Sequence, residues 1–168
     1  MPVSIPVNPP APSKLGLLGW ILLCAAAGAL GAIASVDAAT FYAVLAKPPW
    51  APSAGVFGPV WTVLYLLMAI AAWIAWRAKG WARASGALTL FIAQLVCNAL
   101  WSWLFFAWHR GGLALVDILL LDVLLICTMI GFSRVRTLAA VLLAPYLAWV
   151  VFATALTVAV WRHNPTLL

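Results

Sequence analysis

A chain of 168 residues with 67% hydrophobic side chains, 7% charged side chains and a mean hydropathy of +1.14 has too few polar groups to cover a water-soluble globule. The formal charge of +6 comes from cations that stand singly near the ends of apolar segments, which argues against a nucleic-acid partner and favours a membrane topology. The sequence therefore predicts an all-α membrane protein whose surface partner is lipid.

Residues 1–14 precede the first apolar segment and contain five prolines. No apolar period runs through them, so we expect a disordered Pro-rich tail followed by one domain, residues 15–164. The alternative is a cleavable signal peptide made of Lys14, the apolar run after it and Ala32-Ile33-Ala34. That run is longer than the roughly 7 to 15 residues usual for such a region, which favours the tail.

Five charge-poor apolar segments are each long enough for a membrane-spanning helix, which needs about 20 residues. They are Leu15–Val36, Val56–Trp76, Ala84–Trp108, Gly112–Ser133 and Thr137–Trp161. If they alternate in direction, six of the nine cations lie on the side of the N-terminus and three on the opposite side. By the positive-inside rule, this integral multi-pass protein is expected to have its N-terminus inside and its C-terminus outside.

The connector between the first two segments, Asp37–Gly55, is rich in stiff and aromatic residues. It contains KPPWAP at 47–52, and FGPVWTVLYLLM follows at 57–68. Proline fixes φ and glycine frees it, so such a loop can fold over the end of the bundle as a lid. The alternative is an interfacial loop whose aromatic side chains lie at the depth of the lipid headgroups.

The second, third and fifth segments each carry a stripe of aromatic and weakly polar side chains at helical spacing. The stripes are Trp61, Tyr65, Met68 and Ala72; Gln94, Asn98, Trp101, Ser102 and Phe105; and Tyr146, Trp149, Ala153 and Thr157. Amides in hydrocarbon need partners, so these faces line a ligand-sized cavity or interdigitate as helix contacts. Flat side chains with one polar end suit a flat apolar ligand that carries a few polar groups.

The remaining segments predict packing and no catalytic set. The small residues of the first segment, such as Gly28 and Ala32, allow helices to approach closely, and Pro145 predicts a kink in the fifth segment. Asp117 and Asp122 are turned about 140° apart on a helix and cannot form a carboxylate pair. Asp122 is expected to find a partner on another helix or to lose its charge. No metal site is predicted, because the cysteines stand alone in mid-segment and the histidines at segment ends.

The motifs KPPWAP, FGPVWTVLYLLM, Gln94 with Asn98, WSWLFF at 101–106 and PYLAWVVFA at 145–153 occur in this order. In this combination the chain resembles the TspO/MBR family, the tryptophan-rich sensory proteins related to the mitochondrial translocator protein. The resemblance runs from about Tyr42 to Asn164. It implies a five-transmembrane-helix bundle, usually a homodimer, with a Pro/Trp-rich loop that caps a pocket for porphyrins such as protoporphyrin IX. In animal members it also implies sterol binding.

Carried over by motif, the resemblance assigns ligand binding to a set of residues from the lid and three helices: Tyr42, Pro52, Trp61, Tyr65, Asn98, Trp101, Trp149 and Ala153. It implies a receptor or sensor without a further cofactor. In such a site we expect polar groups at the mouth, Lys47 among them, to meet the porphyrin carboxylates. Some bacterial members are credited with light-dependent porphyrin breakdown by two pocket tryptophans, here Trp61 and Trp149. A third alternative is a transporter of porphyrin or sterol.

The chain departs from the family pattern at several positions. Ser53 and Gly55 replace a proline and a tryptophan of the lid, which lowers its expected stiffness, and Thr157 stands where asparagine is common. Residues 158–160 lack the tyrosine of the sterol-recognition pattern, so a sterol ligand is less favoured.

Overall fold

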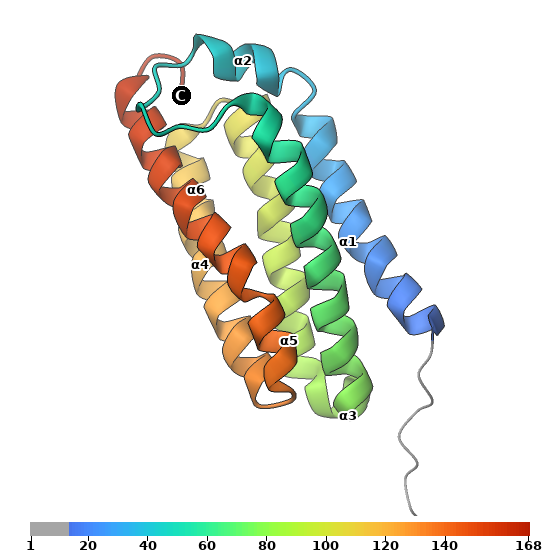
Figure 1. The fold of residues 1–168 in the computed structure, drawn as a ribbon. Coiled ribbons are helices and arrows are strands. Elements are labelled where there is room, and N and C mark those ends of the chain that lie inside the picture. The colour runs from blue at the N-terminus through green and yellow to red at the C-terminus, as the bar shows by residue number, and fades with distance from the viewer. Residues whose placement is uncertain (1–13) are drawn as a thin grey trace, which may run out of the picture.

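The computed structural model describes residues 14–168, and the regular elements of this part of the chain are helices (Figure 1). In chain order they are α1 (Lys14–Ala34), α2 (Ala38–Val44), the 3-10 turn η1 (Ala54–Val56), α3 (Phe57–Ser102), the π-helical turn η2 (Trp103–Ala107), α4 (Gly111–Ser133), α5 (Thr137–Leu142) and α6 (Ala144–His163). The predicted tail lies outside the described residues, except for Lys14, which begins α1.

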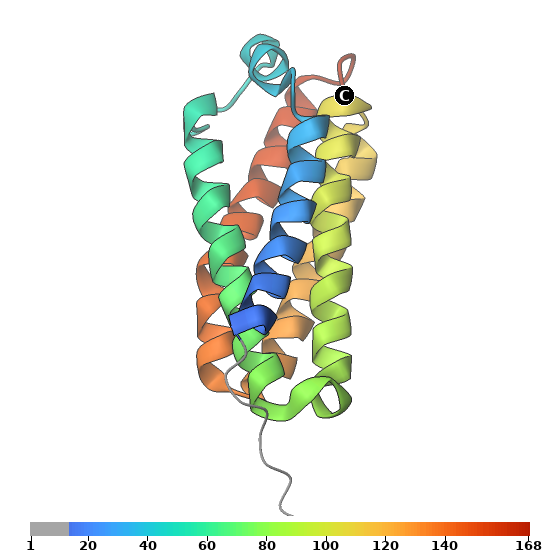
Figure 2. The ribbon, with the colours of Figure 1, turned by 90° about the vertical axis from the view of Figure 1, so that its right-hand side faces the viewer.

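Helix α3 is a hairpin of two membrane spans. Gly80, with φ +67° and ψ 175°, interrupts its helical backbone, and the chain reverses direction there (Figures 1 and 2). We call residues 57–79 the first arm and residues 81–102 the second arm. Long apolar helices at Lys14–Ala34, Ala54–Ala107, Gly111–Ser133 and Thr137–His163 meet the length and composition of membrane spans. Because the second of these contains both arms, the prediction of a five-helix membrane bundle is confirmed.

Replacing Gly80 by alanine is expected to lower the free energy of unfolding by about 1–3 kcal/mol, because its φ and ψ lie in a region open almost only to glycine. Unfolding of the purified protein in detergent, followed by circular dichroism, measures the effect. Gly86→Ala is the matched control, since Gly86 lies in the second arm and a Cβ there meets nothing within 4 Å. Equal stability of the two variants would show that the turn does not need glycine.

The bundle is held together by α1 on α3, α3 on α4 and α4 on α6. Its main core lies between these helices, where Met68, Leu88, Phe91 and Tyr146 are fully buried and small alanines fill the closest approaches. Large aliphatic side chains such as Leu22 point outward. This apolar exterior is what a lipid-embedded protein requires.

The last span is broken near its start, as Pro145 predicts. Helix α5 ends at Leu142 and α6 begins at Ala144, which places Pro145 in the first turn of α6, where it needs no N–H partner. The Leu143 N–H donates to the Ala140 carbonyl at 3.1 Å, and the Leu143 carbonyl accepts from Leu147 N–H at 2.9 Å. Both backbone groups of Leu143, the residue at the break, are thus hydrogen-bonded.

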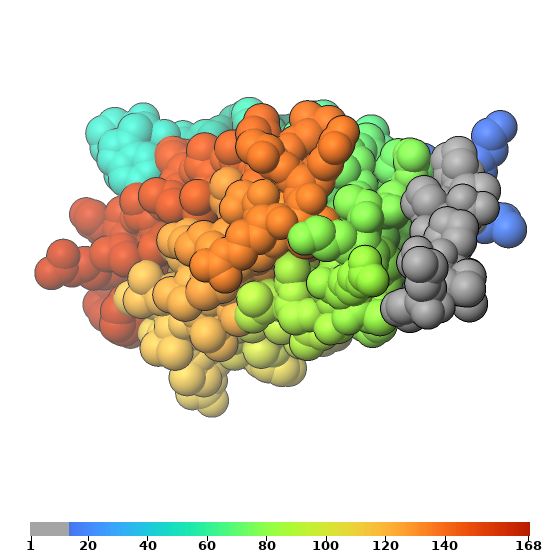
Figure 3. Space-filling view, turned by 90° about the horizontal axis from the view of Figure 1, so that it is seen from below, coloured from blue at the N-terminus to red at the C-terminus, as the bar shows by residue number. Residues whose placement is uncertain are grey.

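The two ends of the bundle differ. Helix α2 and the loop after it cross one end (Figure 1), while the Gly80 turn and the connector between α4 and α5 form the other (Figure 3). At this second end the Lys79 ammonium donates to the Arg134 carbonyl at 3.2 Å. Arg77 and Arg83 flank the Gly80 turn, and Arg136 lies in the connector between α4 and α5. This is the end that the positive-inside rule assigns to the inside.

Candidate functional site

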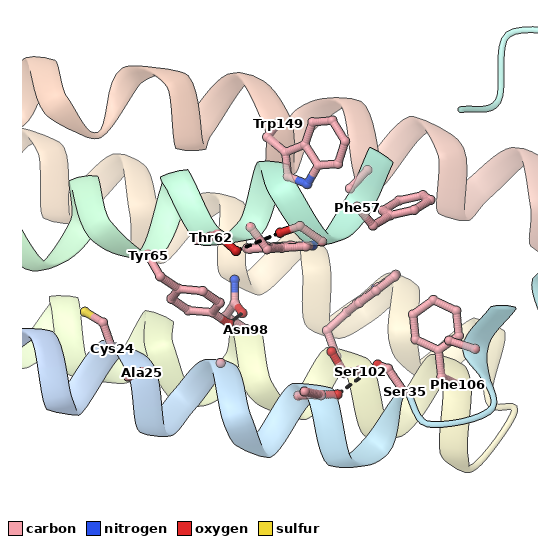
Figure 4. Close-up of a pocket in the computed structure, with 18 of the residues that line it drawn as sticks. Cys24, Ala25, Ser35, Phe57, Thr62, Tyr65, Asn98, Ser102, Phe106 and Trp149 are labelled. Atoms are coloured by element: carbon pink, nitrogen blue, oxygen red, sulfur yellow. Dashed lines mark hydrogen bonds between the residues drawn. The ribbon is translucent and has the colours of Figure 1, made fainter. Parts of the chain in front are cut away.

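A cavity of about 770 Å³ lies among α1, both arms of α3 and α6, next to α2. Its volume falls within the range of about 300–1,000 Å³ that is typical of small-molecule sites. Figure 4 shows side chains from several helices that point into the shared space, among them Tyr65, Asn98 and Trp149. The cavity is therefore formed by tertiary packing and by no single segment.

The structure brings the predicted ligand-binding residues together, with one exception. Tyr42, Trp61, Tyr65, Asn98, Trp101, Trp149 and Ala153 all line the cavity. Pro52 is not part of the lining, and its carbonyl accepts a hydrogen bond from the Tyr42 hydroxyl at 3.0 Å. Pro52 thus acts on the cavity through Tyr42, whose ring it holds in place.

A chain of hydrogen bonds passes from the cavity wall into the core. The Tyr65 hydroxyl donates to Asn98 Oδ1 at 2.6 Å, and Asn98 Nδ2 donates to the Tyr146 hydroxyl at 2.8 Å. The Tyr146 hydroxyl in turn donates to Gln94 Oε1 at 2.8 Å. Only Tyr65 and Asn98 of this chain line the cavity, whereas Tyr146 and Gln94 are fully buried in the packed core. The sequence left open whether the stripes line a cavity or form helix contacts, and the structure shows both. Tyr65 and Asn98 line the cavity, while Tyr146 and Gln94 join helices in the core.

Helix α1 contributes a wall that the sequence interpretation missed, because its small residues indicated packing alone. Cys24, Gly28 and Gly31 line the cavity, and so does Ser35, which directly follows the helix. A Cβ on Gly28 would lie 2.9 Å from the Tyr65 ring, so glycine makes room for that ring. The same series of small residues on one face of α1 is a sequence feature that is compatible with space for a ligand as well as with close packing.

The lid is anchored at both ends. Tyr42 of α2 is buried against Phe57, with ring centroids 5.6 Å apart, and burial raises the pKa of its phenol, which keeps the hydroxyl a donor to Pro52. At the end of α6, Asn164 Oδ1 accepts from Ala46 N–H and Asn164 Nδ2 donates to the Ala46 carbonyl, both at 2.9 Å. This pair ties the lid loop to the last helix.

Lys47 lies away from the mouth contact that was expected for it. Its ammonium donates to the Tyr42 carbonyl at 2.5 Å and to the Leu45 carbonyl at 2.9 Å, and it lies 4.8 Å from the centroid of the Tyr42 ring. The ammonium thus closes the end of α2, where a cation is favourable. It is not part of the cavity lining.

The intramembrane carboxylates also lie outside the cavity. The Thr154 hydroxyl on α6 donates to Asp122 Oδ2 at 2.8 Å, so Asp122 has a partner on another helix, one of the two alternatives that the sequence left open. Asp117 is buried at the start of α4. Within residues 14–168, no three His, Cys, Asp or Glu side chains are grouped so that they could hold a metal ion. The described residues that line the cavity are all uncharged.

Comparison with known proteins shows the family. The TspO/MBR family model matches residues 20–162. The human Translocator protein is 41% identical over 126 residues, which cover 74% of this chain and 75% of that protein. Tryptophan-rich protein TspO of Archaeoglobus fulgidus is 38% identical over 151 residues, 89% of this chain and 97% of its own. Protein CrtK of Rhodobacter capsulatus is 38% identical over 152 residues, 87% and 91% of the two chains. The matched region includes both arms of α3, α4 and α6, and the chain therefore belongs to the TspO/MBR family of membrane proteins.

Proposed function

We propose that this protein is a membrane receptor or sensor that binds protoporphyrin IX, or a similar flat hydrophobic tetrapyrrole, in the cavity between α1, α3 and α6. The observation that carries the proposal is an uncharged cavity of about 770 Å³ whose walls include indole and phenol rings from three different helices, α2, α3 and α6. Such rings offer large flat apolar surfaces with a single polar group each, which matches a flat macrocycle with a few polar substituents.

The aromatic wall is braced by its own contacts. Trp61 and Tyr65 lie with ring centroids 5.5 Å apart in the first arm, and Phe57 meets the Trp149 ring edge to face at 5.9 Å. Trp149 also lies 5.5 Å from Phe152, one turn further along α6. Rings held by such neighbours lose little further freedom when a ligand stacks on them, which favours binding.

Titration with protoporphyrin IX, followed by tryptophan fluorescence, is expected to show saturable quenching. In the double variant Trp61→Phe with Trp149→Phe, we expect a smaller quenching amplitude and binding about tenfold weaker, because two indole contacts worth roughly 1 kcal/mol each are reduced. Trp81→Phe is the control, since Trp81 is 48% exposed and lies beside the Gly80 turn. An absence of saturable quenching in the unmodified protein would refute the proposal.

Light-dependent oxidation of the bound porphyrin by oxygen is a second candidate, alongside binding. It is favoured by the position of Trp61 and Trp149 on the same cavity, where both indoles would lie against one ligand. A bilin-like absorbance that develops only under light, and only when both tryptophans are present, would support this activity. A porphyrin spectrum that stays unchanged under light and oxygen would exclude it.

We also propose that the protein forms a homodimer, as the family resemblance implies.

A further inference from the structure

The cavity reaches the outside of the bundle between two helices. Several residues that line it are also exposed: Ala25 and Ala32 on α1, Gly58, Thr62 and Leu66 on the first arm, and Ala39 and Ala54 at the lid. A residue that both lines a cavity and is exposed lies at its rim. The rim residues of α1 and the first arm therefore border a lateral opening, which we call the slit.

The slit exists because α1 and the first arm diverge. The two helices touch toward the Gly80 end, where a Cβ on Gly16 would collide with the Trp76 ring. They touch again in mid-span, where a Cβ on Gly28 would lie 2.9 Å from the Tyr65 ring. From there toward α2 the helices separate, as Figure 2 shows. The α1 side of the rim carries alanines, whose side chains are too small to fill the space that remains.

The slit opens within the membrane-spanning part of both helices. Leu30 and Ile33 on α1 and Val63 on the first arm are exposed close to the rim, and such apolar side chains face lipid. The Thr62 hydroxyl donates to the Gly58 carbonyl at 3.0 Å, so this polar group of the rim is satisfied within its own helix. An apolar molecule can thus pass from the hydrocarbon into the cavity without breaking a hydrogen bond across the slit.

The end of the bundle is closed by the lid. Besides the bond from Tyr42, the backbone N–H and carbonyl of Ala46 are both hydrogen-bonded to the Asn164 side chain at 2.9 Å. The Trp50 ring meets Phe152 of α6 edge to face, with centroids 5.8 Å apart. Entry from the water would have to break these contacts between the lid and α6, and each net hydrogen bond lost adds to the barrier.

We propose that the ligand enters and leaves the cavity sideways, from the hydrocarbon of the bilayer, through the slit between α1 and the first arm, while the lid stays closed. The proposal rests on the proposed function and adds the source of the ligand, a flat apolar molecule dissolved in the membrane. Apolar molecules concentrate in lipid because transfer out of water is favourable. The small rim residues leave room for a flat molecule to pass edge-on.

The first experiment narrows the slit. The full chain in phospholipid nanodiscs is mixed with protoporphyrin IX, and tryptophan quenching is followed by stopped flow. In Ala32→Phe and in Thr62→Phe, association and dissociation are each expected to slow about tenfold, because the added ring raises the barrier to passage. The dissociation constant is expected to change less than about threefold, since both rates fall together.

Each narrowed variant has a neighbour as its control. Ile33→Phe and Val63→Phe add the same ring to the same helices, at residues that are 60% and 57% exposed and do not line the cavity. Both controls are expected to keep the rates of the unmodified protein. Saturable binding with unchanged association rates in Ala32→Phe and Thr62→Phe overturns the inference and leaves the proposed function standing. An absence of saturable quenching in the unmodified protein refutes the proposed function itself.

The second experiment loosens the lid instead. Asn164→Ala removes both hydrogen bonds to Ala46, and Asn164 does not line the cavity. If the ligand passes through the slit, the association rate is expected to stay within about twofold of that of the unmodified protein, because the barrier does not include these bonds. An association rate that rises about tenfold in Asn164→Ala assigns entry to the lid and overturns the inference.

Discussion

The variant Ala153→Trp is expected to bind protoporphyrin IX at least about 100-fold more weakly than the unmodified protein, a loss of about 2.7 kcal/mol. Ala153 lines the cavity one helical turn beyond Trp149. An indole at this position would occupy the volume in which the macrocycle is proposed to lie, and α6 cannot move outward freely because Thr154 is bound to Asp122 on α4. The dissociation constant from fluorescence titration measures the effect.

Ala155→Trp provides the matched control for this result. Ala155 lies two residues further along α6, is exposed on the outside of the bundle and does not line the cavity. The substitution Ala155→Trp adds the same side chain to the same helix as Ala153→Trp, so effects of tryptophan on membrane insertion or expression appear in both variants. If both variants bind the porphyrin equally well, the ligand does not occupy this cavity.

Asn98→Leu is expected to destabilise the folded protein by about 3 kcal/mol. Asn98 accepts from the Tyr65 hydroxyl and donates to the Tyr146 hydroxyl, and leucine removes both bonds while the two phenols stay in place. A buried donor left without an acceptor costs roughly 1–3 kcal/mol, and loss of the second bond adds to this. Unfolding in detergent with increasing denaturant measures the change in the free energy of unfolding.

Two comparisons separate this effect from a general loss of polarity in the core. Thr128→Val is expected to change stability by less than about 1 kcal/mol, because the buried Thr128 hydroxyl bonds only to the Leu124 carbonyl of its own helix. In the double variant Tyr65→Phe with Asn98→Leu, the loss of unfolding free energy is expected to be smaller than the sum of the losses in the two single variants. The reason is that both partners of one hydrogen bond are removed together. Fully additive losses would show that Tyr65 and Asn98 do not interact.

The spans were predictable from the sequence because a helix in lipid must satisfy its own backbone hydrogen bonds and therefore needs a long uninterrupted apolar run. The predicted gap between Trp76 and Ala84 contains the turn at Gly80, and the predicted kink at Pro145 coincides with the break between α5 and α6. Each of these features depends on residues that are close in the chain.

The aromatic site residues were also accessible to sequence interpretation, through helical spacing and family motifs. Trp61, Tyr65, Asn98 and Trp149 line one cavity as the stripes and the resemblance indicated. The role of α1 was not accessible in the same way. A small residue can permit a helix contact or leave room for a ligand, and Gly28 and Gly31 do both, depending on which side chain of another helix faces them.

By itself, the sequence determined that this is a helical membrane protein with five spans, joined in one place by a loop rich in proline and aromatic residues, with stripes of aromatic and weakly polar side chains on three of the spans. Only the tertiary structure decided that Tyr146 and Gln94 fill the core while Trp101 faces the cavity, and that Lys47 closes α2. The physical reason is that hydropathy and backbone conformation are local properties of the chain. Whether a polar side chain finds a partner or stays free for a ligand depends on groups that other helices bring to it.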